Sequence, residues 1–183
     1  MKCKFLILPL LFIAGSIVAQ VPKVEVPAAV KDAASTVAAA GDAAYLAAKE
    51  AFNKIVKDIP FAYGSAELKL GDPKYMVAGV NLDQFMKNTL IPALAKLVSL
   101  LPAGKVVNVE GNACKTGSEE ASDGFVGNIA LSQQRAESVK QYILDNSKID
   151  GSRLKVVARG SSSPKAGTDP AAVKNCRVSL KVE

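Results

Sequence analysis

Histidine and tryptophan are both absent from this chain of 183 residues. The lack of histidine removes the commonest general base, the usual partner of a nucleophilic Ser or Cys, and the commonest zinc ligand. Most hydrolase functions are therefore disfavoured, and we expect no catalytic residue, no cofactor and no metal site. Aromatic residues make up only 5% of the chain, so the core must consist mainly of Val, Leu, Ile and Ala.

The chain also lacks a continuous basic stripe. It carries 23 Lys and Arg against 17 Asp and Glu, a formal charge of +6, but the lysines are scattered and no aromatic residues alternate with them. That pattern disfavours nucleic acid as a partner. The loop sequence GSSSPKAG lacks the spacing of a Walker motif, which disfavours nucleotide binding.

The N-terminal residues are typical of a secretory signal peptide. Lys2 and Lys4 precede an apolar stretch at 5–14, and small residues follow up to Ala19. The apolar stretch is shorter than the roughly 20 residues that span a bilayer. We therefore expect a signal peptide over 1–19, cleaved near Ala19, and no transmembrane span in the mature chain.

Cysteine is scarce, and its positions matter. Three cysteines are present, of which cleavage would remove Cys3. The mature chain would keep only Cys114 and Cys176, and an even pair in an oxidising compartment favours a disulfide. No cysteine follows the apolar stretch, so the lipid-attachment site of a bacterial lipoprotein is missing.

A helical extension is expected before the main domain. Residues 20–28 contain two prolines and are typical of an extended leader. Residues 28–58 are rich in Ala, and their larger apolar side chains fit one face of an amphipathic helix, loosened at Gly41. We expect this face to pack on the domain that follows. A partner-binding or coiled-coil role is the alternative.

The rest of the chain alternates between strand and helix patterns. Period-two alternation and turn residues predict strands at 61–70, 105–110, 153–158 and 176–182. Apolar residues three and four apart predict helices at 82–101 and 133–146. Pro92 should kink the first helix or mark its effective start, and Ser132 should cap the second. This order predicts a two-layer α/β sandwich of the α+β class, with helices on one face of a mixed sheet.

Three separated segments carry a family pattern. The segment NIALSQQRAESVKQYI matches Asn-x-x-Leu-Ser-x-x-Arg-Ala-x-x-Val through Asn128, Leu131, Ser132, Arg135, Ala136 and Val139. Downstream, RGSSSPKAG resembles a Gly-x-(Gly/Ser)-x-x-Pro loop, and NCRVSLKV resembles a terminal Asn-Arg-Arg-Val strand. The chain therefore resembles the OmpA-like C-terminal (peptidoglycan-associated) domain family, with the element order βαβαββ. We expect a signal peptide at 1–19, an extension with an Ala-rich helix at 20–59, and an OmpA-like domain at 60–183.

The resemblance implies a non-catalytic periplasmic module that holds the peptide stem of peptidoglycan by a diacidic amino acid. Arg135 occupies the family's arginine position, where two parallel hydrogen bonds to a ligand carboxylate are helped by the positive end of the helix dipole. Asn128 occupies the family asparagine that lines the pocket. The implied localisation is the periplasm or the outer membrane, and the implied partner is peptidoglycan or another envelope protein.

The chain departs from the family where the ligand's ammonium would bind. Family members usually read Gly-His-Thr-Asp or Gly-Tyr-Thr-Asp after the second strand, and here Gly111, Asn112, Ala113 and Cys114 take those places. The first arginine of the terminal motif has likewise become Cys176. If the end of the second strand lies beside the start of the last one, as the resemblance implies, Cys114 and Cys176 form a disulfide at the edge of the pocket.

Two functions follow, and the missing aspartate separates them. In the first, the chain binds peptidoglycan with weakened affinity through Arg135 and Asn128, and a loop acid such as Asp123 replaces the family's aspartate. In the second, it is a degenerate scaffold that acts as a protein-interaction or surface module. Arg135 could instead be structural and pair with Asp123, Glu119 or Glu120, and Asn128 could organise the loop. A carboxylate opposite Arg135 favours the first function, and a plugged pocket favours the second.

Overall fold

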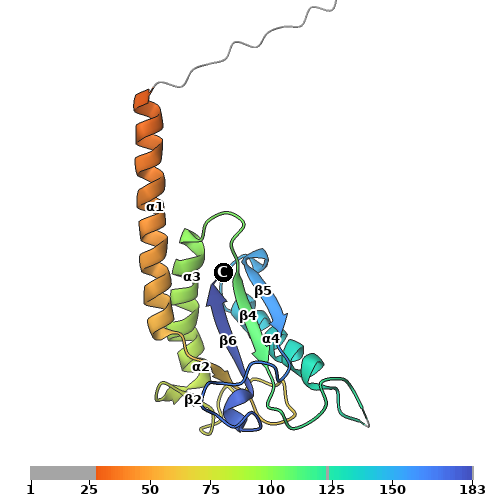
Figure 1. Cartoon of the computed structure of the whole chain (residues 1–183). Coiled ribbons are helices and arrows are strands. Elements are labelled where there is room, and N and C mark those ends of the chain that lie inside the picture. The colour runs from red at the N-terminus through yellow and green to blue at the C-terminus, as the bar shows by residue number, and fades with distance from the viewer. Residues whose placement is uncertain (1–27, 123, 183) are drawn as a thin grey trace, which may run out of the picture.

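The computed structural model describes residues 28–122 and 124–182, with side chains from residue 38 onward. The expected signal peptide and leader, at 1–27, lie outside the described residues. The expected Ala-rich helix is present as α1, Ala28–Ile55. Its C-terminal half packs on the domain through Tyr45, Ala48 and Phe52, and its N-terminal half extends beyond the other elements (Figure 1).

Four strands form a mixed sheet in the order β1-β6-β4-β5. The strands are β1 (Ile59–Pro60), β4 (Val107–Asn112), β5 (Leu154–Ala158) and β6 (Arg177–Val182). β4 is parallel to β5 and antiparallel to β6, and β1 is antiparallel to β6. The register places Asn112 opposite Arg177, so the end of β4 meets the start of β6.

Helices cover one face of this sheet. α4 (Asn128–Asp145) packs on β4 and β5. A second helical segment comprises α2 (Leu82–Phe85), a π-helical turn (Met86–Leu90) and α3 (Ile91–Leu100). Pro92 lies just after the π-helical turn and inside a helical segment that is continuous from Leu82 to Leu100, so it does not begin a separate helix. One core joins strands and helices, and the expected two-layer α/β sandwich with a mixed sheet is confirmed.

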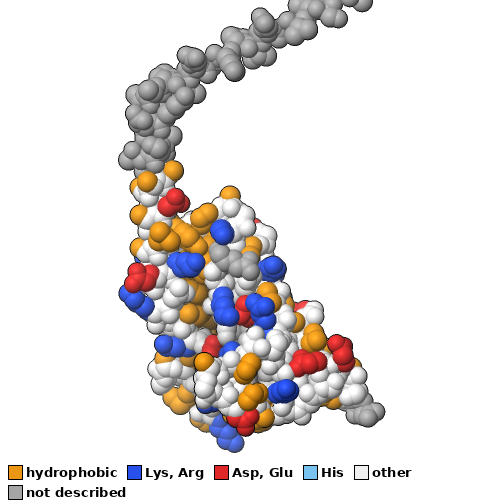
Figure 2. All heavy atoms as spheres, in the orientation of Figure 1, with side chains coloured by type: hydrophobic (Ala, Val, Ile, Leu, Met, Phe, Trp, Pro, Cys, Tyr) orange, Lys and Arg blue, Asp and Glu red, His pale blue; other side chains and the backbone are white. Residues whose placement is uncertain are grey.

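The two faces of the sheet differ in polarity. Successive residues of a strand point to opposite faces. Along β4, Val107 and Val109 join the core, whereas Asn108, Glu110 and Asn112 alternate with them and face the other side. Figure 2 shows Lys and Arg side chains gathered over the strands. The face without helices is therefore polar and rich in positive charge.

The expected strand at 61–70 is wrong. Only Ile59–Pro60 pairs with the sheet, and an irregular segment follows it. This segment forms no strand because its carbonyl groups face α4 and accept hydrogen bonds from Arg135 and Ser138. The sequence pattern could not predict these hydrogen bonds, because their donors lie about 70 residues further along the chain.

A short hairpin that the sequence did not predict follows the irregular segment. It consists of β2 (Met76–Val77) and β3 (Val80–Asn81). The turn residues between the strands, Ala78 and Gly79, both have positive φ, 52° and 81°. Positive φ at both central residues is the geometry of a two-residue hairpin turn that fits the twist of its strands.

The second long helix begins earlier than expected. α4 starts at Asn128 rather than at residue 133, directly after Gly127, whose φ is 84°. Ser132 therefore lies inside the helix and does not cap it. Its hydroxyl donates to the carbonyl of Ile129 and accepts from the amide of Gly160, so it ties α4 to the loop after β5.

Candidate functional site

The site indicated by the resemblance lies where β4 ends against α4. Gly111 allows the two elements to approach closely, because a Cβ there would overlap the carbonyl oxygen of Ser132. β4 ends one residue later, and the amide of Ala113 donates to the carbonyl of Gly160 at 2.7 Å. The glycine that opens the family motif is thus required by packing in this chain.

Cys114 and Cys176 are joined by a disulfide, as the resemblance implies. Their Cα atoms lie 5.0 Å apart although 62 residues separate them along the chain. The antiparallel register of β4 and β6 brings them together, because Asn112 lies opposite Arg177. Both cysteines are buried in the core, so the bridge between the end of β4 and the start of β6 is apolar.

Arg135 projects from α4 into the interior and is 0% exposed. Its Nε donates to the carbonyl of Ser65 at 2.8 Å, its Nη1 to that of Asn112 at 2.9 Å, and its Nη2 to that of Ala62 at 2.8 Å. The guanidinium also lies 5.5 Å from the centroid of the Phe61 ring, a cation–π contact. Arg135 therefore joins α4 to the end of β4 and to the irregular segment after β1.

The charge of Arg135 has no carboxylate partner among the side chains of residues 38–122 and 124–182. Burial lowers the pKa of Arg135 to about 10, so the guanidinium stays protonated at neutral pH. A buried cation is costly unless other groups compensate it, and here three carbonyl dipoles do so. The expected alternative of a pair with Glu119 or Glu120 is wrong, and Asp123 lies outside the described residues.

Asn128 is buried at the first position of α4 and shapes the loop before it. Its side-chain amide donates to the carbonyl of Gly117 at 2.9 Å, and its backbone amide donates to the carbonyl of Ser118 at 2.9 Å. This is the loop-organising arrangement that the sequence left open beside a ligand contact.

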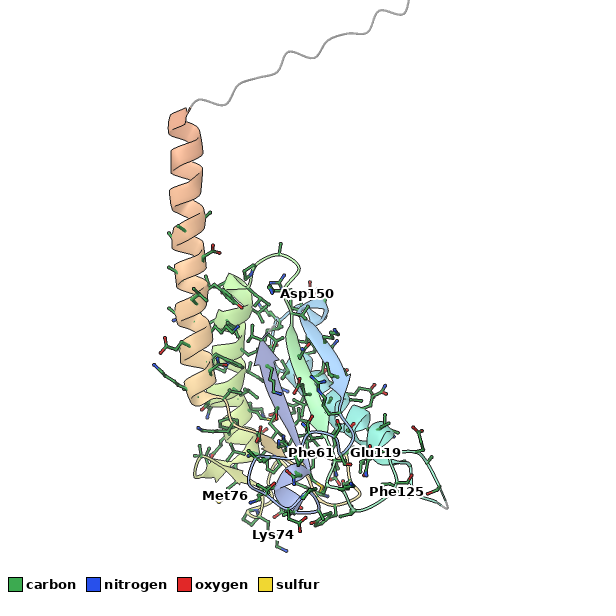
Figure 3. The ribbon with its side chains drawn as sticks, viewed as in Figure 1. Phe61, Lys74, Met76, Glu119, Phe125 and Asp150 are labelled. Atoms are coloured by element: carbon green, nitrogen blue, oxygen red, sulfur yellow. A yellow bond between two sulfur atoms is a disulfide. The ribbon has the colours of Figure 1, made fainter. Side chains whose placement is uncertain are left out.

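Glu119 ties two loops together, a contact that the sequence did not predict. Its carboxylate accepts hydrogen bonds from the hydroxyl of Ser161 and, at 3.2 Å, from the amide of the same residue. Gly160 leaves room for this carboxylate, because a Cβ there would overlap it. Figure 3 shows Glu119 and Phe61 at the same end of the sheet. Gly160, shortly after the end of β5, was the one sequence signal that Glu119 approaches the backbone closely there.

Arg177 holds the loop after β5 to the start of β6. Its Nη2 donates to the carbonyl of Ser163 at 3.0 Å, and its Nη1 to that of Asn175 at 3.4 Å. Its Nε lies 3.4 Å from Oδ2 of Asp58, which precedes β1. Arg177 is therefore engaged inside the protein, at the β1–β6 edge of the sheet.

Two clefts of about 450 and 490 Å³ open on the described surface, and neither is lined by Arg135, Asn128 or Cys114. The described residues contain no group of three or more carboxylates and thiols that could hold a metal ion. No helix in the described part of the chain is long and apolar enough to cross a bilayer. In this conformation three of the five N–H groups of Arg135 donate to backbone carbonyls, and the whole side chain is enclosed.

The structure is that of a two-layer α/β module in which Arg135 of α4 is bonded to the carbonyl of Asn112 at the end of β4. The family model for the OmpA family matches residues 79–177, more than half of the chain. The chain belongs to the OmpA family.

Solved structures of low sequence identity are similar to this chain. The peptidoglycan-associated lipoprotein from Burkholderia pseudomallei is 20% identical with a TM-score of 0.49, and the match covers 69% of this chain and 90% of that one. The C-terminal domain of Helicobacter pylori MotB is 20% identical with a TM-score of 0.48, covering 70% and 86%. The OmpA-like domain of FopA1 from Francisella tularensis is 22% identical with a TM-score of 0.43, covering 69% and 73%. No curated protein matches the chain.

Proposed function

We propose that this chain is an exported, non-catalytic module of the bacterial envelope whose OmpA fold serves as an interaction scaffold. It would consist of a signal peptide at 1–19, an extension at 20–59 and the OmpA-like domain at 60–183. The enclosure of Arg135 carries the proposal. The residue that the family resemblance assigns to the ligand is 0% exposed, and three backbone carbonyls already accept its hydrogen bonds.

A ligand carboxylate could reach Arg135 only if the segment that encloses it moved, which would break hydrogen bonds to these carbonyls. Two parallel hydrogen bonds to a carboxylate use two nitrogen atoms of one guanidinium. Each nitrogen of Arg135 already donates one N–H to the backbone, and the N–H groups that remain are enclosed with the rest of the side chain. Releasing the carbonyl of Ala62 or Ser65 without a new donor would cost about 1–3 kcal/mol for each acceptor left buried. This cost offsets what the ligand would gain.

The second half of the family's ligand contact is also missing. A disulfide sulfur at Cys114 carries no charge with which to pair a ligand ammonium. Desolvating an ammonium without a partner costs several kcal/mol. Loss of the carboxylate and enclosure of the guanidinium together favour a scaffold whose partner is another envelope protein.

Peptidoglycan binding with weakened affinity is the second candidate, and one observation favours it. The buried charge of Arg135 has no carboxylate partner within the described residues. A ligand carboxylate would compensate that charge if the segment 62–65 moved aside. Asn128 would then line the pocket, and Asp123 or Glu120 would supply the acid for the ligand's ammonium.

Co-sedimentation of the purified full chain with peptidoglycan sacculi separates the two candidates. We expect the wild type to remain in the supernatant. The variant with Cys114→Asp and Cys176→Arg restores the family residues at both positions, and we expect it to bind more than the wild type. The control with Cys114→Ala and Cys176→Ala removes the disulfide without restoring charge, and should not bind.

Wild-type binding that is lost in Arg135→Lys, a variant that keeps the charge but not the planar fork, would replace the scaffold proposal with the second candidate. Circular dichroism of each variant shows whether a loss of binding reflects a loss of fold. Pull-down with solubilised envelope proteins then identifies the partner of the scaffold.

A further inference from the structure

A cationic cleft lies at the β1–β6 edge of the sheet. It has a volume of about 450 Å³ and opens between β1, the start of β6 and the β2–β3 hairpin. Its charged lining comprises four basic residues and one acidic residue, Lys57, Lys165, Lys174, Arg177 and Asp58. Arg135 does not line it, so the cleft is separate from the position discussed above.

Asp58 neutralises part of this charge. It lies 2.6 Å from Lys165 and 3.4 Å from Arg177, and it accepts a hydrogen bond from Ser179 at 2.7 Å. Burial alone would raise the pKa of Asp58, but hydrogen bonds from Lys165 and Ser179, with the charges of Lys165 and Arg177, hold it below its ordinary value of 3.8. Asp58 is therefore ionised at neutral pH, and one negative charge faces four positive ones.

Lys57 and Lys174 supply the uncompensated charge. Both are exposed, and no hydrogen bond or ion pair with another described residue engages either ammonium group. Lys57 follows α1, and Lys174 lies in the 3₁₀ turn before β6, Val173–Asn175. Like charges brought to one cleft repel each other, and an anion bound between them removes that repulsion.

The chemistry of the free donors favours phosphate over carboxylate. A carboxylate is best held by two parallel hydrogen bonds from a guanidinium. The Nη atoms of Arg177 already donate to backbone carbonyls, and its Nε is buried without a hydrogen-bond partner among the described residues. The two lysines present ammonium groups, which act as compact point charges in phosphate sites.

One rim of the cleft is apolar. Met76 lines it and is 51% exposed, and Val80 on the same hairpin is 38% exposed. Figure 3 shows Met76 and Lys74 together at the end of the molecule opposite Asp150. A ligand that carries an apolar group beside its phosphate would contact the lysines and the hairpin at once.

We infer that this cleft binds phosphate groups between the ammonium groups of Lys57 and Lys174, with Lys165, Arg177 and Asp58 fixed behind them. The phosphate belongs either to a soluble molecule or to an anionic lipid headgroup. The inference goes beyond the scaffold function and does not depend on Arg135.

NMR titration of the ¹⁵N-labelled full chain with sodium phosphate tests the inference, with sodium chloride at equal ionic strength as the reference. We expect saturable shifts at the backbone amides of Lys57, Ala78 and Lys174. The variant with Lys57→Gln and Lys174→Gln should lose affinity about tenfold for each charge-assisted hydrogen bond removed. The control with Lys105→Gln and Lys148→Gln removes the same charge from exposed lysines outside the cleft, and should keep the affinity.

Co-sedimentation with phosphatidylglycerol and phosphatidylcholine vesicles identifies the source of the phosphate. Binding to phosphatidylglycerol alone, weakened by Met76→Ser, identifies a lipid headgroup. Phosphate shifts without vesicle binding identify a soluble ligand. The inference is overturned if phosphate causes no saturable shifts, or if the shifts persist unchanged in the Lys57→Gln and Lys174→Gln variant.

Discussion

In our proposal Arg135 has a structural role in place of a ligand-binding one, although the fold of the family is kept. The family resemblance assigns this arginine to a ligand carboxylate. In this chain its donors meet the carbonyls of Ala62, Ser65 and Asn112, and its cation lies over Phe61. The acceptors come from segments that only tertiary folding brings together, so the guanidinium connects three parts of the domain.

Arg135→Met should lower the free energy of unfolding by about 3–5 kcal/mol. Methionine fills much of the same volume but donates no hydrogen bonds, so one buried and two partly buried carbonyls lose their donor. Urea denaturation followed by circular dichroism measures the change. Lys148→Met, at an exposed position, is the control and should change stability little. A loss below about 1 kcal/mol for Arg135→Met, the size of an ordinary surface effect, would contradict the structural role.

Gly111→Ala should lower the free energy of unfolding by about 3 kcal/mol or more, because overpacking here forces backbone against backbone. The added Cβ would overlap the carbonyl of Ser132 in the neighbouring helix. Gly71→Ala is the matched control, since nothing lies within 4 Å of a Cβ at that position. Equal thermal midpoints for the two variants would show that β4 and α4 do not approach as closely as described.

At the scale of elements, β4 lies between β6 and β5, and its residue Glu110 lies on the polar face of the sheet. The carboxylate of Glu110 is almost fully buried between Arg159, which directly follows β5, and Lys181 of β6. Burial by itself would raise the pKa of Glu110. The hydrogen bonds from Arg159 and Lys181, together with their charges, outweigh burial and hold the pKa below its ordinary value of 4.5.

A carboxylate whose pKa is lower in the folded state stabilises the fold above its unfolded pKa, and this contribution is lost as the pH falls through the folded pKa. We therefore expect the wild type to lose stability as the pH drops below about 5. Glu110→Gln should flatten this acid dependence. Asp58 contributes with the same sign, so the dependence should not vanish entirely.

Urea denaturation at a series of pH values measures this acid dependence. Glu120→Gln removes one exposed carboxylate from a loop and is the control for charge alone. An acid dependence as steep in Glu110→Gln as in the wild type would argue against a stabilising role for the Glu110 ion pairs.

The success of sequence patterns differed from element to element. The expected strands at 153–158 and 176–182 match β5 and β6 within one residue, because long alternating segments keep their pattern in a half-buried sheet. β1 has only two residues, Ile59–Pro60, which is too short for any period. The start of α4 was missed because Ser132 has the residue type of a helix cap, although its hydroxyl serves a tertiary contact with Gly160.

At the scale of the whole molecule, one disulfide closes a long loop that contains α4 and β5. Cys114 and Cys176 are separated by 62 residues. Chain entropy predicts that such a link stabilises the fold by about 4 kcal/mol, chiefly by restricting the unfolded chain. The bridge also joins the end of β4 to the segment that enters β6.

Reductant should lower the urea midpoint of the wild type, and the variant with Cys114→Ala and Cys176→Ala should be insensitive to it. The double variant and each single variant should lose similar stability, about 4 kcal/mol or somewhat less, because any of these changes removes the link. Free-thiol titration of the denatured protein is the check on the bond itself. Two titratable thiols without reductant from Cys114 and Cys176 would contradict the bridge.

The candidate site was predictable only in part. The count of cysteines and the family resemblance together predicted the pairing of Cys114 and Cys176. The enclosure of Arg135 was not predictable, because it depends on where the irregular segment after β1 lies. The same limit applies to the cationic cleft, whose lysines follow α1 and precede β6, since no local pattern connects residues that meet only through the sheet.

The most direct test of the account is the Nε–H signal of Arg135 in a ¹H–¹⁵N NMR spectrum at neutral pH, recorded while the diacidic amino acid of peptidoglycan stems is added. We predict a slowly exchanging signal, since its hydrogen bond to Ser65 is enclosed, with no shift up to millimolar ligand. A saturable shift of this signal would contradict the closed site and show that Arg135 still holds the ligand.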